Sequence, residues 1–301
     1  MATTAPAPLR SGDKVAIVCP ARKASAEELA AAVATLQSWD LEVVLGESTT
    51  AAQHQFGGSD EVRARDLQRQ LNDPSIRAIL CARGGYGTTR IIDQLDFSRF
   101  AQDPKWVAGF SDITALNSHL LALGHQSIHG VMPMLFHQES GEESLESLRR
   151  ALFGEEVAYS APAHALNRLG TATGELTGGN LSLLQTLTGT RSECPTAGRI
   201  LFLEDIDEYL YAIDRMMVHL ERTSKLQHLA GLLVGHFTNP QDNTIPYGQT
   251  PNEIIDHYAG KYGFPIAHHF PVGHEPQNMA LICGREARLV VEETGAHLTY
   301  L

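Results

Sequence analysis

The stretch "WVAGFSDITALNSHLLAL", residues 106–123, passes directly from an apolar run to a helical pattern. "WVAGF" is typical of a short buried strand, and the apolar residues within 113–121 recur at the spacing of one helix face. Ser111 and Asp112 stand between these two segments. The stretch therefore predicts a strand that turns sharply into a helix, with a serine hydroxyl at the turn.

The same alternation of strand and helix precedes this stretch. Apolar runs predict strands at 14–20, 41–46 and 76–82, and helical patterns follow at 25–39, 59–73 and 88–95. Ser25 and Glu28 have the spacing of a capping box, and Ser59 is the N-cap expected for the second helix. Strands that alternate with helices in this way indicate βαβ units and an open parallel sheet.

The chain after residue 150 is less regular. Small, polar and proline residues over 151–169 predict a connection between two domains. Further strands are expected at 198–208, 229–237 and 287–293, with a helix at 212–226. The predicted fold class is α/β: an N-terminal parallel-sheet, Rossmann-like domain over 1–150, followed by a smaller, β-rich mixed domain over 170–301.

Composition limits the partners that this chain can bind. It has 301 residues with 23 Lys and Arg against 35 Asp and Glu, a formal net charge of -12. Binding to nucleic acid needs the opposite balance, so no nucleic acid partner is expected. We expect neither a signal peptide nor a membrane partner, and the four dispersed cysteines suit a reducing compartment. The sequence therefore predicts a cytoplasmic protein.

Three polar groups follow apolar runs, and ligands in open parallel sheets bind at the carboxyl ends of the strands. They are Arg83-Gly84-Gly85, Ser111-Asp112 and Glu204-Asp205. Ser111 is either a nucleophile or only the N-cap of its helix, because serine is favoured at that position. Glu204 is either a catalytic carboxylate or one of several acids placed near a helix N-terminus.

The glycines of "RGGYG" (83–87) and a group of histidines leave further alternatives open. The glycine N–H groups can face an oxyanion or a phosphate, but the pattern is not the dinucleotide fingerprint. His268, His269 and His274 could hold a zinc ion, although their spacing matches no zinc pattern, and a loop histidine also suits a general base.

Several motifs together resemble one peptidase family. They are "GDKVAIVCPA", "AILCARGGYGTTRIIDQLD", "VAGFSDITALNSHL", "IHGVMP", "GELTGGNLSLLQTLTGT", "LFLEDIDEYLYAIDRMMVHL" and "PVGHEPQNMALICGREARL". In this order they resemble the LD-carboxypeptidases of peptidase family S66. The resemblance covers nearly the whole chain. It implies an α/β domain, a smaller β-rich domain, and a Ser–Glu–His triad at their interface.

The resemblance also assigns roles to particular residues. It implies Ser111 of "GFSD" as nucleophile, Glu204 of "FLED" as acid and His274 of "VGHEPQN" as base. The backbone N–H groups of Gly85 and Asp112 are the candidates for the oxyanion hole. Substrate-binding candidates are Arg83, Gly84 and Asn180. One departure from the family is "NMALICG" (278–284), where a leucine–proline pair is usual before the glycine.

The implied reaction removes the terminal D-alanine from murein tetrapeptides during cell-wall recycling. It implies a small peptide as substrate, free or sugar-linked, a homodimer, and no cofactor or metal. One alternative is an enzyme similar to the microcin C immunity protein, which cleaves aminoacyl-nucleotide conjugates; Trp39 and Trp106 do not suggest a platform for stacking a base. Two further alternatives are a zinc carboxypeptidase and a non-catalytic module that binds a phosphorylated ligand.

Overall fold

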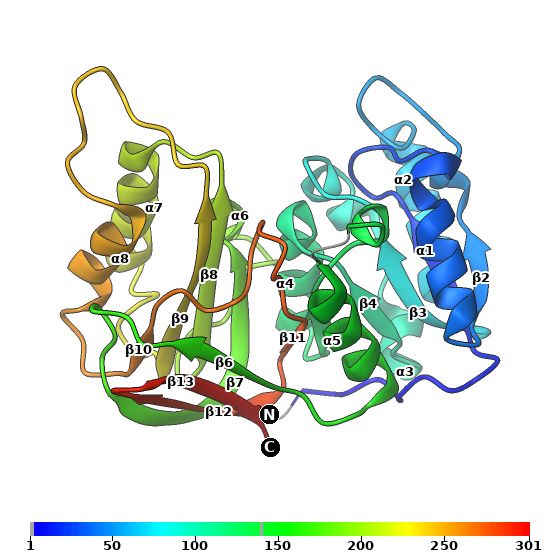
Figure 1. Cartoon of the computed structure of the whole chain (residues 1–301). Coiled ribbons are helices and arrows are strands. Elements are labelled where there is room, and N and C mark those ends of the chain that lie inside the picture. The colour runs from blue at the N-terminus through cyan, green and yellow to red at the C-terminus, as the bar shows by residue number, and fades with distance from the viewer. Residues whose placement is uncertain (1–2, 139–140) are drawn as a thin grey trace.

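The computed structural model describes residues 3–138 and 141–301, and within them the strands form two sheets that lie side by side (Figure 1). The first sheet has the order β11-β5-β4-β3-β1-β2, and β1 to β5 are parallel. Its strands are β1 (Lys14–Val18), β2 (Glu42–Leu45), β3 (Ile76–Cys81), β4 (Trp106–Ala108), β5 (Ser127–His129) and the antiparallel β11 (Leu281–Cys283).

The second sheet is mixed, with the order β10-β9-β8-β7-β12-β13-β6. Strands β7 to β10 are parallel, whereas β12, β13 and β6 are antiparallel to their neighbours. The strands are β6 (Ala158–Pro162), β7 (Gly170–Asn180), β8 (Ile200–Ile206), β9 (Gly231–Thr238), β10 (Ile266–Ala267), β12 (Glu286–Glu292) and β13 (Gly295–Tyr300). The predicted fold class, a parallel-sheet α/β half followed by a mixed β-rich half, is confirmed.

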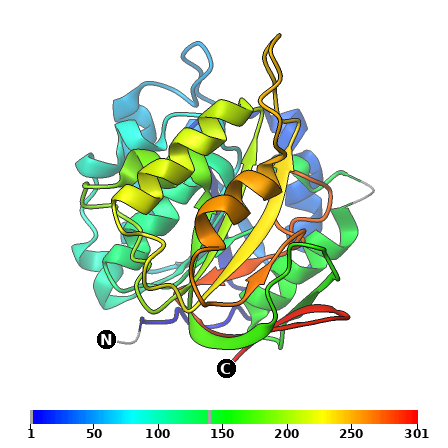
Figure 2. The ribbon, with the colours of Figure 1, turned by 90° about the vertical axis from the view of Figure 1, so that its left-hand side faces the viewer.

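Helices cover both faces of the first sheet and the outer face of the second. The helices are α1 (Ala26–Ser38), α2 (Asp60–Asn72), α3 (Ser98–Gln102), α4 (Thr114–Ala122), α5 (Glu142–Phe153), α6 (Leu181–Leu187), α7 (Leu210–Arg222) and α8 (Pro251–Ala259). One apolar cluster joins the first sheet to α1 and α5, and another joins its opposite face to α2, α3 and α4. Helices α7 and α8 lie over the second sheet (Figure 2).

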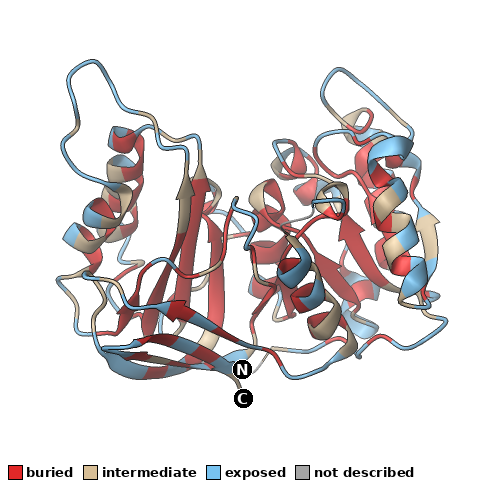
Figure 3. Ribbon diagram, in the orientation of Figure 1, coloured by how far each residue is buried: buried red, intermediate tan, exposed pale blue. Residues whose placement is uncertain are grey.

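Burial follows this layering (Figure 3). The central strands are buried along their length, because both of their faces are covered. Most helices bury one face and expose the other, whereas α4 is buried on every side from Thr114 to Leu121. The predicted capping box of Ser25 and Glu28 is confirmed at the start of α1, and Ser59 caps α2 as predicted.

The two halves of the chain are interwoven at their edges. Residues 151–169, where a connection was expected, contain the end of α5 and the edge strand β6. Strand β11, from the expected C-terminal half, returns to the first sheet and pairs with β5. None of the helices in the described ranges is long and apolar enough to cross a membrane.

The predicted helix over 88–95 is wrong. Thr88–Arg90 and Ile92–Gln94 form separate 3-10 turns. The Asp112 carboxylate accepts a hydrogen bond from the N–H of Thr88, at 2.8 Å. This bond ties the first turn to the segment after β4, so a contact distant in sequence overrides the local helical pattern.

Candidate active site

Ser111 lies just beyond β4, in a backbone conformation that is unusual for serine. Its φ is 62°, and it begins the 3-10 turn Ser111–Ile113 that leads into α4. An N-cap residue has an extended backbone and accepts a hydrogen bond with its side chain, but the N-cap position of α4 is Ile113. The alternative that Ser111 is only an N-cap is therefore wrong. A strained serine at a strand-to-helix turn is instead typical of a nucleophile.

The glycine loop after β3 lies directly against Ser111. A Cβ atom on Gly84 would lie 2.9 Å from Ser111 Cβ and 3.2 Å from Ser111 Oγ, so only glycine allows this approach. In the described part of the chain, the N–H groups of Gly85 and Asp112 donate no hydrogen bond to another residue. Two backbone donors therefore remain available to a ligand beside Ser111.

The Asp112 side chain, unlike the Asp112 N–H group, has a hydrogen-bond partner within the protein. It is buried, and its Oδ2 accepts the N–H of Thr88. Burial raises the pKa of this carboxyl above its usual value, and the bond to Thr88 opposes that rise. The side chain therefore holds the Ser111 turn to the end of the glycine loop.

The second sheet supplies a carboxylate and an imidazole. Glu204 is fully buried in β8, and its Oε2 lies 2.7 Å from Nδ1 of His274. Gly273, with φ 131°, allows this approach, because a Cβ atom there would lie 3.1 Å from Glu204 Cβ. Since Nδ1 is bonded to Glu204, Nε2 of His274 is left to face a substrate or a nucleophile.

Two effects act on the pKa of His274. Burial lowers it, because the charged imidazolium loses its hydration. The adjacent Glu204 carboxylate, by its charge and its hydrogen bond, more than offsets burial, so the pKa is raised above the ordinary histidine value. This environment stabilises the imidazolium that forms when a base takes up a proton.

The junction of the two sheets brings these groups together. The N–H of Asn180, at the end of β7, donates to Oγ1 of Thr114 at the start of α4, and Asn180 pairs with Glu204 in the sheet. The rings of Phe110 and His274 are 4.8 Å apart. Ser111 and His274 both lie in the described part of the chain, and no hydrogen bond joins them there. Catalytic hydrogen bonds often tighten only when substrate binds.

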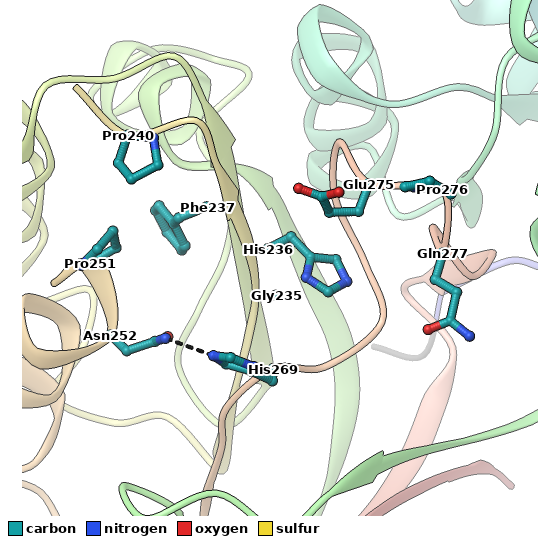
Figure 4. Close-up of a pocket in the computed structure, with 10 residues that line it drawn as sticks. All are labelled: Gly235, His236, Phe237, Pro240, Pro251, Asn252, His269, Glu275, Pro276 and Gln277. Carbon is teal, nitrogen blue, oxygen red and sulfur yellow. Dashed lines mark hydrogen bonds between the residues drawn. The ribbon is translucent and has the colours of Figure 1, made fainter. Parts of the chain in front are cut away.

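Two pockets share the segment that follows His274. One, of 680 Å³, is lined by Phe110, Val131, Leu135, Gln138, Gly141, Ile206, His274, Glu275, Pro276 and Asn278. The other, of 470 Å³ (Figure 4), is lined by Gly235, His236, Phe237, Pro240, Pro251, Asn252, His269, Glu275, Pro276 and Gln277. Glu275 and Pro276 line both pockets, so the segment that follows His274 separates them. The His274 imidazole itself lines the 680 Å³ pocket, which has room for a peptide beside it.

Two of the predicted substrate-binding residues have other contacts. Asn180 is the buried N-cap of α6, and its side chain bonds with Asp205 and Ser182. Arg83 lies 3.6 Å from the Glu28 carboxylate, and it lines a separate pocket beside α1. Their roles as substrate ligands stay predictions, which these contacts do not favour.

The three histidines considered for zinc do not come together. His268 and His269 stack on His164, whereas His274 pairs with Glu204. Burial lowers the pKa of His268 to about 4. Among the residues with a described structure, no three His, Cys, Asp or Glu side chains are arranged to hold a metal ion.

Three residues near the site had no assigned role from the sequence. Asn278 Oδ1 accepts the N–H of Gly273, and Ser144 of α5 bonds with Pro276 and Asn278, so both hold the His274 loop. His129, within the quoted motif "IHGVMP", is fully buried, and burial lowers its pKa to about 4. Only Asn278 and His129 lay in motifs that could have drawn attention to them.

A strained serine at a strand-to-helix turn, a buried Glu–His pair and a parallel-sheet α/β fold are the features of a serine hydrolase. The N-terminal domain of LD-carboxypeptidases matches residues 15–130, and their C-terminal domain matches residues 173–289. The chain belongs to this LD-carboxypeptidase family.

Individual relatives agree with this membership. A probable murein peptide carboxypeptidase of Bacillus subtilis is 36% identical over 97% of this chain and 93% of its own length. A murein tetrapeptide carboxypeptidase of Pseudomonas aeruginosa is 31% identical over 92% of each chain. The crystal structure of a muramoyltetrapeptide carboxypeptidase from Oxalobacter formigenes matches with a TM-score of 0.88 and 27% identity, covering 95% of this chain and 98% of that one.

The fold is also shared by a protein whose solved complex contains a nucleotide conjugate in place of a murein peptide. The microcin C7 self immunity protein MccF, solved in complex with aspartyl sulfamoyl adenosine, matches with a TM-score of 0.86 and 19% identity over 98% of each chain. In the present chain Trp39 packs against Phe136, and Trp106 is buried in β4. Neither tryptophan lines the pocket beside His274.

Proposed function

We propose that this protein is a serine LD-carboxypeptidase that removes the terminal D-alanine from murein tetrapeptides. The hydrogen bond between His274 and the buried Glu204, at the junction that also holds Ser111, is the observation that carries the proposal. The relatives named for murein peptides supply the substrate class. Four free, buried cysteines suit a reducing cytoplasm, where we place the enzyme. We also propose that it is a homodimer.

The proposed mechanism uses the three side chains in sequence. His274 Nε2 takes the proton of Ser111 Oγ, which attacks the carbonyl before the terminal D-alanine. Glu204 keeps the imidazole oriented and stabilises its charge. Collapse of the tetrahedral intermediate breaks the C–N bond, and His274 returns the proton to the amine of the leaving D-alanine. Water, activated by the same imidazole, then hydrolyses the acyl-enzyme.

The oxyanion of the intermediate needs donors fixed before the reaction. The N–H groups of Gly85 and Asp112 fill this role in the proposal. Gly85 follows Gly84, which lies against Ser111, Asp112 follows Ser111 itself, and neither N–H bonds to another described residue. Removal of one such donor typically costs about 10²–10³ in rate. The Asp112 side chain, which accepts the N–H of Thr88, serves the shape of the loop and not the reaction itself.

Mass spectrometry of L-Ala-γ-D-Glu-meso-diaminopimelyl-D-Ala tests the proposal directly. The wild-type protein is expected to release one alanine, and Ser111→Ala is expected to lose roughly 10⁶-fold in kcat. Ser118→Ala is the matched control, because its hydroxyl lies in α4 and has no hydrogen-bond partner among the described residues. An intact tetrapeptide with a folded wild-type protein would contradict the substrate, and equal cleavage by Ser111→Ala would remove Ser111 as nucleophile.

A parallel assay with aspartyl sulfamoyl adenosine distinguishes cleavage of aminoacyl-nucleotide conjugates from cleavage of murein peptides. Hydrolysis of this conjugate in place of the tetrapeptide would favour an activity like that of the microcin C immunity protein. Binding of a phosphorylated ligand without turnover of either compound, unchanged by Ser111→Ala, would favour a non-catalytic module.

A further inference from the structure

The segment between β1 and α1 carries Arg22 onto the glycine loop. The N–H of Arg22 donates to the carbonyl oxygen of Gly84 at 3.3 Å. The atoms nearest to the Cβ position of Gly85 all belong to the Arg22 side chain, and Nε lies 2.8 Å from that position. Arg22 is therefore in direct contact with the residue whose N–H is the first candidate for the oxyanion hole.

The stem of Arg22 is held in place. The N–H of Lys23 donates to the carbonyl oxygen of Gln55 at 2.9 Å, and Arg22 forms a β-bridge with Phe56. Nε of Arg22 lies 3.3 Å from Oε1 of Gln55. This support positions the guanidinium, while its two terminal nitrogens keep their donors for another partner.

The charge of Arg22 is not neutralised by the protein. Its side chain is exposed, and no carboxylate of the described residues lies within 4.0 Å of it. The neighbouring arginines differ, because Arg63 and Arg90 both pair with Asp60, and Arg83 pairs with Glu28. Arg22 is thus a cation beside the glycine loop that pairs with no carboxylate of the described residues and has two terminal nitrogens free to donate to a ligand.

A carboxypeptidase needs such a cation at one defined place. Its substrate ends one residue after the cleaved bond, and consecutive Cα atoms are about 3.8 Å apart. The terminal carboxylate must therefore lie within a few ångströms of the oxyanion hole. The Arg22 side chain lies against Gly85, so a guanidinium and a candidate oxyanion-hole N–H come from residues in contact, which suits this arrangement.

We propose that Arg22 binds the terminal carboxylate of the substrate and so restricts the enzyme to free C-termini. This inference rests on the proposed carboxypeptidase function. The planar guanidinium would bind the carboxylate side-on and donate two parallel hydrogen bonds to it. Arg22 thereby takes the role that the sequence suggested for Arg83, whose guanidinium faces Glu28 instead.

The test compares the murein tetrapeptide with its C-terminal amide. Arg22→Gln is expected to lower kcat/KM for the free acid by about 10- to 100-fold, mainly through KM, and to leave kcat/KM for the amide nearly unchanged. Arg22→Lys should recover part of the loss. Arg83→Gln tests the competing candidate. If Arg22 binds the carboxylate, this variant should keep the wild-type preference for the acid, because the Arg83 side chain lines another pocket.

Binding measurements keep the inference testable without turnover. In a Ser111→Ala background, calorimetry should show that the acid binds more tightly than the amide, and that Arg22→Gln removes this difference. An acid-to-amide preference that survives Arg22→Gln, or one that Arg83→Gln abolishes, would overturn the assignment. A wild-type protein that leaves the tetrapeptide intact would contradict the proposed function instead, and the role of Arg22 would then be decided by binding alone.

Discussion

Glu204 is the residue on which the proposed site depends most. It is fully buried, and its Oε1 has no hydrogen-bond partner among the described residues. Burying a carboxylate costs several kcal/mol unless an opposite charge or hydrogen bonds compensate for the lost hydration. The imidazole of His274 supplies this compensation, and it becomes most effective when His274 is protonated.

Replacement of Glu204 by Gln should lower the pKa of His274. Burial would persist and favour the neutral imidazole, while the carboxylate that raises the pKa would be gone. In the wild type, kcat/KM should fall as pH falls through the His274 pKa, with a midpoint above the ordinary histidine value. A proton NMR titration of the histidine ring protons in both proteins measures the shift. An unchanged His274 pKa in Glu204→Gln would contradict this account.

At the scale of elements, helix α5 of the first half holds the loop that carries His274. Ser144 Oγ donates to the carbonyl oxygen of Pro276 at 2.8 Å and accepts the N–H of Asn278 at 2.7 Å. Ser147, one turn later, accepts the N–H of Ala280 at 2.9 Å. One helix therefore fixes both the catalytic loop and the start of β11.

Ser144→Ala should lower kcat by about 10-fold, because the loop after His274 loses both bonds and about 1–3 kcal/mol of stabilisation. Ser147→Ala is the comparison variant, since it removes a similar bond farther from His274. Both variants should lose stability in urea unfolding, but only Ser144→Ala should lose kcat in proportion. Equal kcat values in the two variants would show that α5 supports the fold without positioning the base.

At the scale of the whole molecule, the site exists because β7 of the second sheet packs closely against α4 of the first half. Gly179, near the end of β7, has φ 142°, and a Cβ atom there would lie 2.5 Å from Oγ1 of Thr114 in α4. The next residue of β7, Asn180, pairs with Glu204 of β8. Separation at this contact would therefore move the carboxylate of the second sheet away from the serine of the first.

Gly179→Ala should destabilise the protein by about 1–3 kcal/mol and reduce activity further than the loss of folded protein explains. Gly189→Ala is the matched control, because Gly189 has φ 81° but nothing within 4 Å of its Cβ position. It should show only the cost of backbone strain, about 1 kcal/mol. Urea unfolding and kcat/KM on each variant measure the two effects. A Gly179→Ala variant no worse than the control would contradict a tight junction.

Much of the fold could be predicted from the sequence, because its signals are local. Apolar runs, the Ser25–Glu28 capping box and the Ser59 cap depend on neighbours within a few residues, and each marked its element correctly. The candidate site residues Ser111 and Glu204 stood out for the same reason, since both follow apolar strands. His274 needed the resemblance to a family.

The tertiary structure decided what depends on contacts between distant residues. It replaced the helix expected over 88–95 with short turns, because the Asp112 carboxylate holds Thr88. It placed β11 in the first sheet, and it turned Arg83 toward Glu28 while Arg22 came to lie on Gly85. Local hydrogen bonding and periodicity determine where a strand or helix begins. Which side chains meet at the junction of two sheets is set by packing across the whole chain, and no local pattern encodes it.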